Sequence, residues 1–254
     1  MVPPLSVVII TFNEERNIER CISSVKDWAD EILVVDSFST DATKSICIKY
    51  GVNFVEHIFE GHIEQKNYAL SLAKNDWVLS LDADEAPDEQ LVKEIIKTDR
   101  TSENLAYSMN RLTNYCGKWI RHGSWYPDKK MRLFNKKNTQ WAGINPHDKT
   151  ETSANVSVKH LQGNILHYSY YSIEQHMKQL DNFSSIAANA YFNKKKSAGF
   201  INIVVNPFFA FFRDYFLRAG FLDGYEGFII ARFTAYYTLQ KYVKLRHLKK
   251  SVNM

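Results

Sequence analysis

Short apolar runs alternate with helix-like segments through the first hundred residues, and this alternation constrains the fold more than any other feature. The run LSVVIIT at 5–11 is continuous and β-branched, as expected of a strand buried on both faces. Similar runs, EILVVD at 31–36, NFVEHIF at 53–59 and DWVLSLDADE at 76–85, predict three more strands. The pattern therefore predicts a parallel, doubly wound α/β sheet, whose ligands bind at the carboxyl ends of the strands.

The segments that follow these runs have the capping residues and the apolar spacing that are typical of helices. Asn13 can cap a first helix that has two acidic residues in its first turn and an apolar stripe behind them. Further helices are predicted from about Ser39, over 62–74 and over 88–97.

The pattern changes beyond residue 105. Two short strands at 105–112 and 131–135 lie on either side of a turn-rich, aromatic stretch. We expect them to form an antiparallel extension that completes the sheet and builds a second wall over the site. Helical periodicity returns over 172–193 and continues in the aromatic tail.

Composition and length limit the protein class. At 254 residues and 29.5 kDa, the chain suits one large domain or a catalytic domain with an appendage. With 45% hydrophobic residues it has ample material for a core, which excludes a disordered protein. The three cysteines form no CxxC pair, so a disulfide scaffold or zinc site is disfavoured and a cytoplasmic location is expected. Residues 1–13 lack a basic leader region, so no signal peptide is expected.

Charge is unevenly spread along the chain, whose formal net charge is +4. From Asn189 onward there are 11 Lys and Arg against 3 Asp and Glu, so a basic tail follows an acidic body. Such a tail favours a polyanionic partner, either nucleic acid or an anionic membrane. Its longest uncharged stretch, 197–212, is shorter than the ~20 residues of a bilayer span, so an interfacial helix fits better. Five basic residues suited to an anionic leaflet close the chain: Lys241, Lys244, Arg246, Lys249 and Lys250.

An acidic pair, Asp82 and Asp84, ends the fourth predicted strand. Residues two apart on a strand share a face, so both carboxylates can address one cation at the ligand-binding edge of the sheet. Oxygen ligands suit Mg²⁺ or Mn²⁺, and such a metal neutralises the charge of a departing diphosphate. The alternative is a solvated acidic loop.

Two more strand ends point to the same edge. Thr11, Asn13 and Glu14 follow the first strand, and Asp36 ends the second. An acid in the latter place either takes a ribose hydroxyl or base proton or caps the next helix. The glycine patterns of a Rossmann dinucleotide site and of a P-loop are absent from the sequence, which disfavours both.

These residues carry a resemblance to a known family. The segments TFNEERNIERCISSVKDWADEILVVDSFSTDAT and QKNYALSLAKNDWVLSLDADE resemble the family 2 glycosyltransferases of GT-A fold, over at least residues 5–100. The later segments GKWIRHGSWYPDKKMRLF and GNILHYSY are similar to a branch of small bacterial enzymes that add glucose to the first heptose of the lipopolysaccharide inner core.

The resemblance implies roles for individual residues. The residues that it places at the nucleotide and donor sugar are Thr11, Asn13, Glu14, Asp36, Lys66, Asn67 and Asp82. Asp84 and His167 are implied at the metal, and Asp148 as the general base in place of the family's Glu, with Glu151 or His147 as alternatives.

Four residues are candidates for the acceptor side: Trp125, Tyr126, Arg132 and His147. The aromatic residues among them suit either packing of the second wall or a platform for a sugar. Arg132 suits a solvated face or a phosphorylated acceptor, and His147 is otherwise a structural histidine.

The sequence thus predicts a GT-A catalytic domain over 1–190, with a nucleotide-sugar part at 1–100 and an acceptor part at 101–190, followed by an amphipathic, basic helical extension at 191–254. The predicted activity is inverting, metal-dependent transfer of a hexose, glucose from UDP-glucose, to a lipid-linked saccharide at the cytoplasmic face of the inner membrane. Alternatives are a different UDP-sugar or glycolipid acceptor, a nucleotidyltransferase, a catalytically inactive scaffold, and a tail that only packs on the catalytic domain. Nucleic acid is not expected as a partner.

Overall fold

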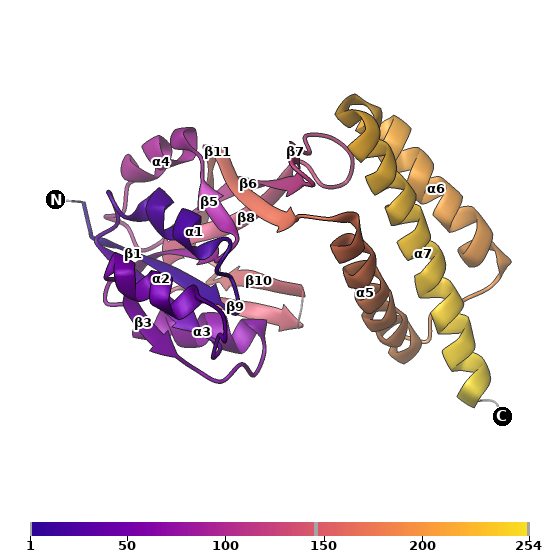
Figure 1. The fold of residues 1–254 in the computed structure, drawn as a ribbon, viewed down its shortest axis with the longest axis horizontal. Helices are drawn as coiled ribbons and strands as arrows, with labels where there is room; N and C mark the ends of the chain where they lie inside the picture. Colours follow the sequence, from indigo (N-terminus) through magenta and orange to yellow (C-terminus); the bar gives the residue numbers. More distant parts are fainter. Residues whose placement is uncertain (1, 145–146, 253–254) are drawn as a thin grey trace. The chain divides into compact units, whose positions relative to one another are not determined.

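The fold is that of a computed structural model, which describes residues 2–144 and 147–252 (Figure 1). The side chains of Ile144, His147 and Val252 are outside this description. The chain forms two compact units, each of which is built from two separate segments of the sequence. Unit 1 comprises Met1–Arg111 and Asp128–Tyr168, and unit 2 comprises Leu112–Pro127 and Ser169–Met254.

The four predicted strands form the parallel part of a mixed sheet, in the order β3-β2-β1-β4. Their bounds are Leu5–Thr11 for β1, Glu31–Asp36 for β2, Asn53–Glu56 for β3 and Trp77–Asp82 for β4. The register pairs Thr11 with Asp36 and Ile10 with Asp82. The polar strand ends therefore meet at one edge of the sheet, as predicted.

The second half of the sheet is the expected antiparallel extension. Strand β8 pairs antiparallel with β4 and with β6, and β11 and β5 complete the order. The short β7 pairs with β6, while β9 and β10 form a separate hairpin. The bounds are Glu85–Pro87 for β5, Leu105–Tyr115 for β6, Lys118–Trp119 for β7, Asp128–Asn135 for β8, Thr139–Ile144 for β9, His147–Thr152 for β10 and Ser157–Tyr170 for β11. The predicted α/β class with a mixed sheet is confirmed.

The strand predicted over 76–85 is shorter than expected. It ends at Asp82, because a turn at Ala83 and Asp84 redirects the chain into β5. The backbone N–H of Asp82 donates to the Glu85 carboxylate at 3.0 Å across this turn, and β5 pairs with β11 instead of continuing β4. The two acids of the pair consequently do not share one strand face.

Four helices accompany the parallel strands. They are α1 (Ile18–Val25), α2 (Thr43–Tyr50), α3 (His62–Leu72) and α4 (Glu89–Ile96). The start predicted for α1 is wrong, because Asn13 has a left-handed backbone (φ 53°) and its side-chain oxygen accepts the N–H of Thr40. The start predicted for α2 is also too early, since Ser39 is hydrogen-bonded to Asp36.

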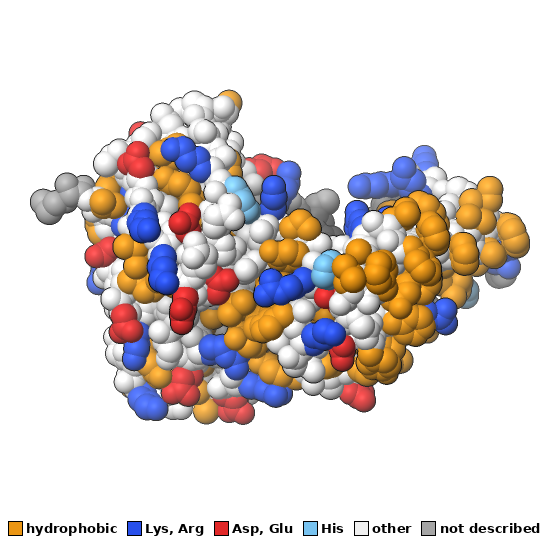
Figure 2. Space-filling view, turned by 90° about the horizontal axis from the view of Figure 1, so that it is seen from above, with side chains coloured by type: hydrophobic (Ala, Val, Ile, Leu, Met, Phe, Trp, Pro, Cys, Tyr) orange, Lys and Arg blue, Asp and Glu red, His pale blue; other side chains and the backbone are white. Residues whose placement is uncertain are grey.

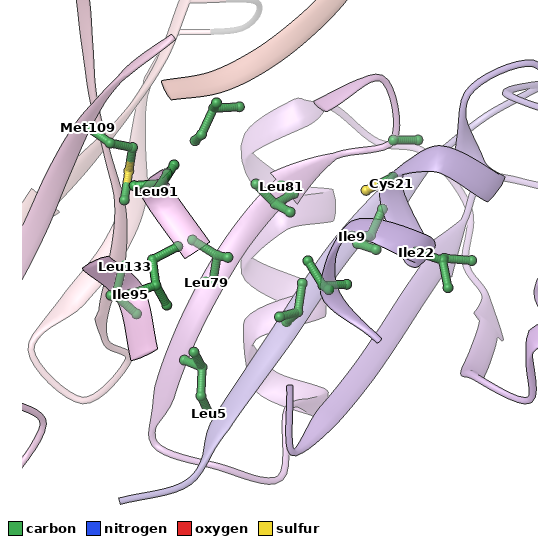
Figure 3. Close-up of a cluster of buried hydrophobic side chains, with 14 of the residues drawn as sticks. Leu5, Ile9, Cys21, Ile22, Leu79, Leu81, Leu91, Ile95, Met109 and Leu133 are labelled. Carbon is green, nitrogen blue, oxygen red and sulfur yellow. The ribbon is translucent and has the colours of Figure 1, made fainter. Parts of the chain in front are cut away.

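One core cluster of unit 1 joins the parallel strands to α1, α2 and α4 (Figure 3), and a second cluster takes in Ala69 and Leu70 of α3. Ile9 and Leu79 from adjacent strands and Ile22 from α1 are fully buried, as the apolar runs predict. Burying a side chain of this size contributes about 1.5–3 kcal/mol, so this cluster fixes α1 and the strand register together.

Unit 2 is mainly helical. Helix α5 (Ile173–Asn193) begins at a capping box between Ser172 and Gln175 and packs on α7 (Gly224–Val252). The helical run between them begins with the π-helical segment η1 (Ile201–Val205) and the α-helix α6 (Asn206–Phe212). It continues with a second π-helical segment, η2 (Arg213–Leu217), and ends in the 3₁₀ helix η3 (Gly220–Asp223). Among the residues that the structure describes, no helix combines the length and apolarity that a bilayer crossing requires.

A buried carboxylate organises the turn-rich segment of unit 2. Asp223 is only 4% exposed, and its side chain accepts the backbone N–H groups of Arg121 and His122 and contacts Nδ1 of His122 at 3.0 Å. Its backbone carbonyl accepts the ammonium of Lys118. The segment 118–122 is thus tied to the helical part through one acid.

We predict that Asp223→Ala lowers the free energy of unfolding by about 2–4 kcal/mol, because it leaves two backbone donors without their acceptor. Urea unfolding followed by tryptophan fluorescence measures the loss. Asp27→Ala, on an exposed surface position, is the control and should change stability little. Equal stability of the two variants would contradict the assigned role of Asp223.

Candidate active site

A buried ammonium lies at the carboxyl edge of the parallel strands. Lys66, on the buried face of α3, has a side chain only 4% exposed. Its Nζ lies 3.0 Å from Oδ1 of Asp82 and 2.7 Å from Oδ2 of Asp148, and 4.3 Å from the centre of the Trp141 ring. A charge in such a place is stable only when it is paired, so Lys66 holds both carboxylates close.

Arg132 approaches the same acids from β8. Its Nη2 donates to Oδ2 of Asp82 at 3.0 Å and to Oε1 of Glu85 at 2.9 Å, and the residue is 3% exposed. Its Nη1 is buried and has no hydrogen-bond partner among the residues that the structure describes. A buried guanidinium N–H left open in this way suits a polar ligand that enters the site.

The charge of Asp82 is set by these two cations. Burial alone would raise the pKa of Asp82, but the neighbouring charges of Lys66 and Arg132 hold it well below its usual range. Asp82 is therefore a carboxylate at every physiological pH, and it already has two partners.

Asn67 places the strand hairpin that carries Asp148. Its amide Nδ2 donates to the carbonyl of Trp141 at 2.8 Å, and its Oδ1 accepts the N–H of Trp141 at 2.9 Å. This two-bond clamp holds β9 on α3, and Asp148 lies on β10 opposite Gly143 of β9. The clamp explains how Asp148 reaches Lys66, 82 positions away in the chain.

The nucleotide-side candidates lie at the ends of β1 and β2. Asp36 is fully buried and accepts the N–H of Ser39 at 2.7 Å, while the Ser39 hydroxyl accepts the N–H of Asn13 at 2.7 Å. Thr11 is buried, and within residues 2–144 and 147–252 its Oγ1 has no hydrogen-bond partner. Asp36 therefore does not cap α2, which begins at Thr43, but orders the turn after its own strand.

Glu14 has an unusual acidity. Burial raises its pKa from 4.5 to about 7, and the charges of Asp84, Asp41 and Asp82 raise it further against a hydrogen bond from Asn17. Burial is the largest cause of this pKa shift, and a bound cation would offset the smaller contribution of the three neighbouring carboxylates.

Asp84 and His167 meet beside this edge. Nε2 of His167 lies 3.2 Å from Oδ2 of Asp84, and the next residue, Tyr168, donates its N–H to the Asp84 carbonyl at 2.9 Å. The described residues contain no group of three or more His, Cys, Asp or Glu that could hold a metal. Mg²⁺ commonly takes only one or two protein carboxylates, with phosphate oxygens and waters completing its shell. Asp84 with His167 fits such an ion as a partial ligand set.

Two of the acceptor-side candidates lie in unit 2. The Trp125 ring stacks on Tyr170 at 5.4 Å, within an aromatic cluster of unit 2 that includes Tyr115 and His176. Tyr126 is half-buried in the same unit. The side chain of His147 lies outside the described residues, so its prediction stays open.

Sequence reasoning missed two members of the charged cluster. Glu85 is fully buried and accepts from both Arg132 and the backbone of Asp82, and it directly follows the acidic pair. Trp141 forms an apolar wall for Lys66 and Arg132. Glu85 is the third acid of the segment DADE, and this clustering of acids was the available signal for it.

The charged cluster lies within a segment that matches a known family. A model of glycosyl transferase family 2 matches residues 6–165, which include Lys66, Asp82, Arg132 and Asp148. The chain belongs to glycosyl transferase family 2. It is a glycosyltransferase, and its mixed sheet flanked by helices is the GT-A architecture predicted for this family.

Two relatives of this family 2 enzyme match over nearly its whole length. An uncharacterized glycosyltransferase of Rickettsia bellii is 34% identical over 260 residues, which cover 98% of this chain and 88% of the relative. LpsC of Rhizobium meliloti, a lipopolysaccharide core biosynthesis glycosyltransferase, is 26% identical over 264 residues, with 99% and 96% covered. Among solved structures, the chain is similar to glucosyl-3-phosphoglycerate synthase from Mycobacterium tuberculosis in complex with Mn²⁺, UDP and glucosyl-3-phosphoglycerate, with 26% identity, a TM-score of 0.38 and 44% of each chain covered.

We predict that Glu14 makes the stability of this family 2 enzyme fall as pH rises. Its pKa of about 7 exceeds the usual 4.5, so between these values the folded state binds more protons than the unfolded state and loses stability with increasing pH. Glu14→Gln should therefore gain stability relative to the unaltered enzyme between pH 5 and pH 8, as measured by Tm in EDTA.

Glu19→Gln serves as the control, because its side chain is 53% exposed on α1. It should follow the unaltered enzyme at both pH values. Parallel Tm curves for Glu14→Gln and Glu19→Gln would show that Glu14 titrates normally.

Proposed function

We propose that the enzyme is an inverting, metal-dependent glycosyltransferase that moves glucose from UDP-glucose to heptose of the lipopolysaccharide inner core. One observation carries the mechanism: the buried Lys66 lies between Asp82 and Asp148, which puts a cation for a leaving diphosphate beside a carboxylate for an acceptor. The similarity to LpsC along nearly the full length of both chains supports a lipopolysaccharide acceptor. A lipid-linked acceptor in turn favours a location at the cytoplasmic face of the inner membrane.

Lys66 and Arg132 would stabilise the leaving group. As the bond between sugar C1 and the diphosphate oxygen breaks, negative charge grows on the diphosphate, and preorganised cations in a dry site stabilise it strongly. Nη1 of Arg132, which has no hydrogen-bond partner in the described part of the chain, would be available for this purpose. Asp84 and His167 would hold Mg²⁺ or Mn²⁺, which when bound supplies a further positive charge to the same diphosphate.

Asp148 would act as the general base. The acceptor hydroxyl loses its proton to the Asp148 carboxylate while its oxygen forms the new bond to C1, and the nucleoside diphosphate leaves from the opposite face. One direct displacement of this kind inverts the configuration at C1. In the structure Asp148 is paired with Lys66 at 2.7 Å, and a diphosphate that attracts Lys66 would release Asp148 to accept the proton.

Donor binding is tested by the thermal stability of the purified protein with a panel of nucleotide sugars, with and without Mg²⁺ or Mn²⁺. A ligand at ~100 times its Kd stabilises the native state by roughly 2.7 kcal/mol. We predict that UDP-glucose stabilises the enzyme only with metal, and that Asp84→Ala abolishes the metal-dependent part.

The control is Asp76→Ala, since Asp76 lies just before the other end of β4 and is 46% exposed. It should leave the shift unchanged. Stabilisation by UDP-glucose that is equal with and without metal would contradict the metal dependence, and stabilisation by another nucleotide sugar alone would replace the proposed donor.

We further predict that Asp148→Asn keeps the affinity for the donor but lowers the transfer rate about 10²–10⁴-fold, which is the usual contribution of a general base. Transfer is measured with a heptose-containing core acceptor and followed by release of UDP. Glu151→Gln, on the same strand with a side chain 50% exposed, is the matched control and should keep near-normal transfer.

The pair of variants also distinguishes the alternatives. Loss of transfer in Glu151→Gln, with activity kept in Asp148→Asn, would move the base role to Glu151. An unaltered protein that binds the donor but transfers to no saccharide would favour the inactive scaffold.

A further inference from the structure

The helical run from Phe200 to Leu217 in unit 2 exposes an apolar face. Phe200 and Phe208 are 73% and 72% exposed, values far above those of ordinary core residues. Side chains four residues apart lie on one face of a helix, and the exposed residues keep this spacing. We call this the exposed apolar face; its members are Phe200, Ile201, Val204, Val205, Phe208, Phe209, Phe212 and Phe216.

The opposite face of the same run is already occupied. Ala210 and Asp214 are buried, and α6 packs on α7. Asp214 accepts the Ser124 hydroxyl at 2.7 Å and pairs with Arg213 at 2.9 Å. The inward side of the run is therefore already packed, while the apolar side chains on its other side are exposed to solvent.

The apolar area extends beyond this run. More than half of the exposed large hydrophobic residues in the described part of the chain lie between residues 200 and 228. With ~200 Å² for each fully exposed ring, the seven Phe among them together expose on the order of 700 Å² of apolar surface. Figure 2 shows hydrophobic side chains gathered over the helical part of the molecule, with Lys and Arg beside them.

The exposed charges that flank the exposed apolar face along the chain have one sign. Lys194, Lys195 and Lys196 are exposed and directly precede it, and Arg218 is 49% exposed just after it. The acids of this segment point elsewhere: Asp214 and Asp223 are buried, and Glu226 pairs with Lys118. The solvent therefore meets apolar groups bordered by cations.

We infer that the exposed apolar face and its lysine border form the surface by which unit 2 binds an anionic lipid bilayer. The phenyl rings would insert at the level of the acyl boundary while the lysines contact acidic headgroups. This deepens the proposed function, which needs access to a lipid-linked acceptor, and names the surface that provides it.

The structure favours this segment over the basic end of the chain. Lys244 is 2.6 Å from Asp181 and hydrogen-bonds to two serines of α5, and Lys241 lies over tyrosine rings, 4.7 Å from that of Tyr191. Both cations thus help α7 to pack on α5. The apolar groups needed for insertion are concentrated at 200–217 instead.

A bilayer also fits better than a second copy of the chain. Two copies joined through this face would bring the same cations together without acids to neutralise them, whereas an anionic membrane neutralises every one. Self-association remains an outcome that the experiment can detect.

The test is flotation of the full chain, without donor, with vesicles of phosphatidylcholine alone or with 30% phosphatidylglycerol. We expect binding to the anionic vesicles only, and weaker binding at high salt. The double variant Phe200→Ser/Phe208→Ser should lower the partition coefficient at least tenfold, and Lys194→Gln/Lys195→Gln/Lys196→Gln should lower it by a similar factor.

The matched control is Ile48→Ser/Ile96→Ser, which removes two exposed apolar side chains from α2 and α4. It should bind vesicles like the unaltered protein. Equal binding of both double variants, or equal binding to neutral vesicles, would overturn the inference. So would a dimer in analytical ultracentrifugation that Phe200→Ser/Phe208→Ser dissociates, combined with no vesicle binding.

Donor-induced stabilisation is measured on the same variants. Vesicle binding requires no nucleotide. A variant that loses vesicle binding but keeps a normal donor-induced thermal shift therefore bears only on the membrane-binding surface and leaves the proposed transfer activity untouched. A normal vesicle result with no donor shift would count against the proposed transfer activity alone.

Discussion

The candidate site depends on one buried ammonium, that of Lys66. An unpaired charge at 4% exposure would be costly, so the fold must deliver carboxylates to it. Asp82 arrives from β4 and Asp148 from the β9–β10 hairpin, and the Asn67 clamp on Trp141 holds that hairpin on α3. Three parts of the chain thereby meet around a single side chain, and the proposed sugar transfer would use the same groups.

The two units carry different physical properties. Unit 1 holds the buried ions at the edge of the parallel strands, whereas unit 2 holds the exposed apolar face and two buried acids, Asp214 and Asp223. The family match lies at residues 6–165, and the relatives in Rickettsia and Rhizobium extend along nearly the whole chain. The helical part is thus shared with relatives named as glycosyltransferases and is not peculiar to this chain.

Local patterns made the fold predictable, and long-range pairing limited the prediction of the site. The bounds of β1 and β2 follow directly from continuous apolar runs, and the stripe of α1 from its spacing. The start of α1 was missed because Asn13 is held by Thr40, a partner 27 positions away. The bonds of Arg132 to Asp82 and Glu85 likewise join distant positions, so no spacing along the chain could show them. The roles of the site residues themselves stay predictions.

The balance of charge around Lys66 has a consequence for turnover. Lys66 and Arg132 face three carboxylates, those of Asp82, Glu85 and Asp148, and Arg111 lies 3.6 Å from Glu85, so each of these acids already has a cationic partner. A spent nucleoside diphosphate would therefore compete with resident anions for both cations instead of filling an open positive pocket. When it departs, the carboxylates can resume their pairing at once. Under the proposed function, a resting state whose charges are already paired would limit product inhibition and favour rapid clearance of the nucleotide.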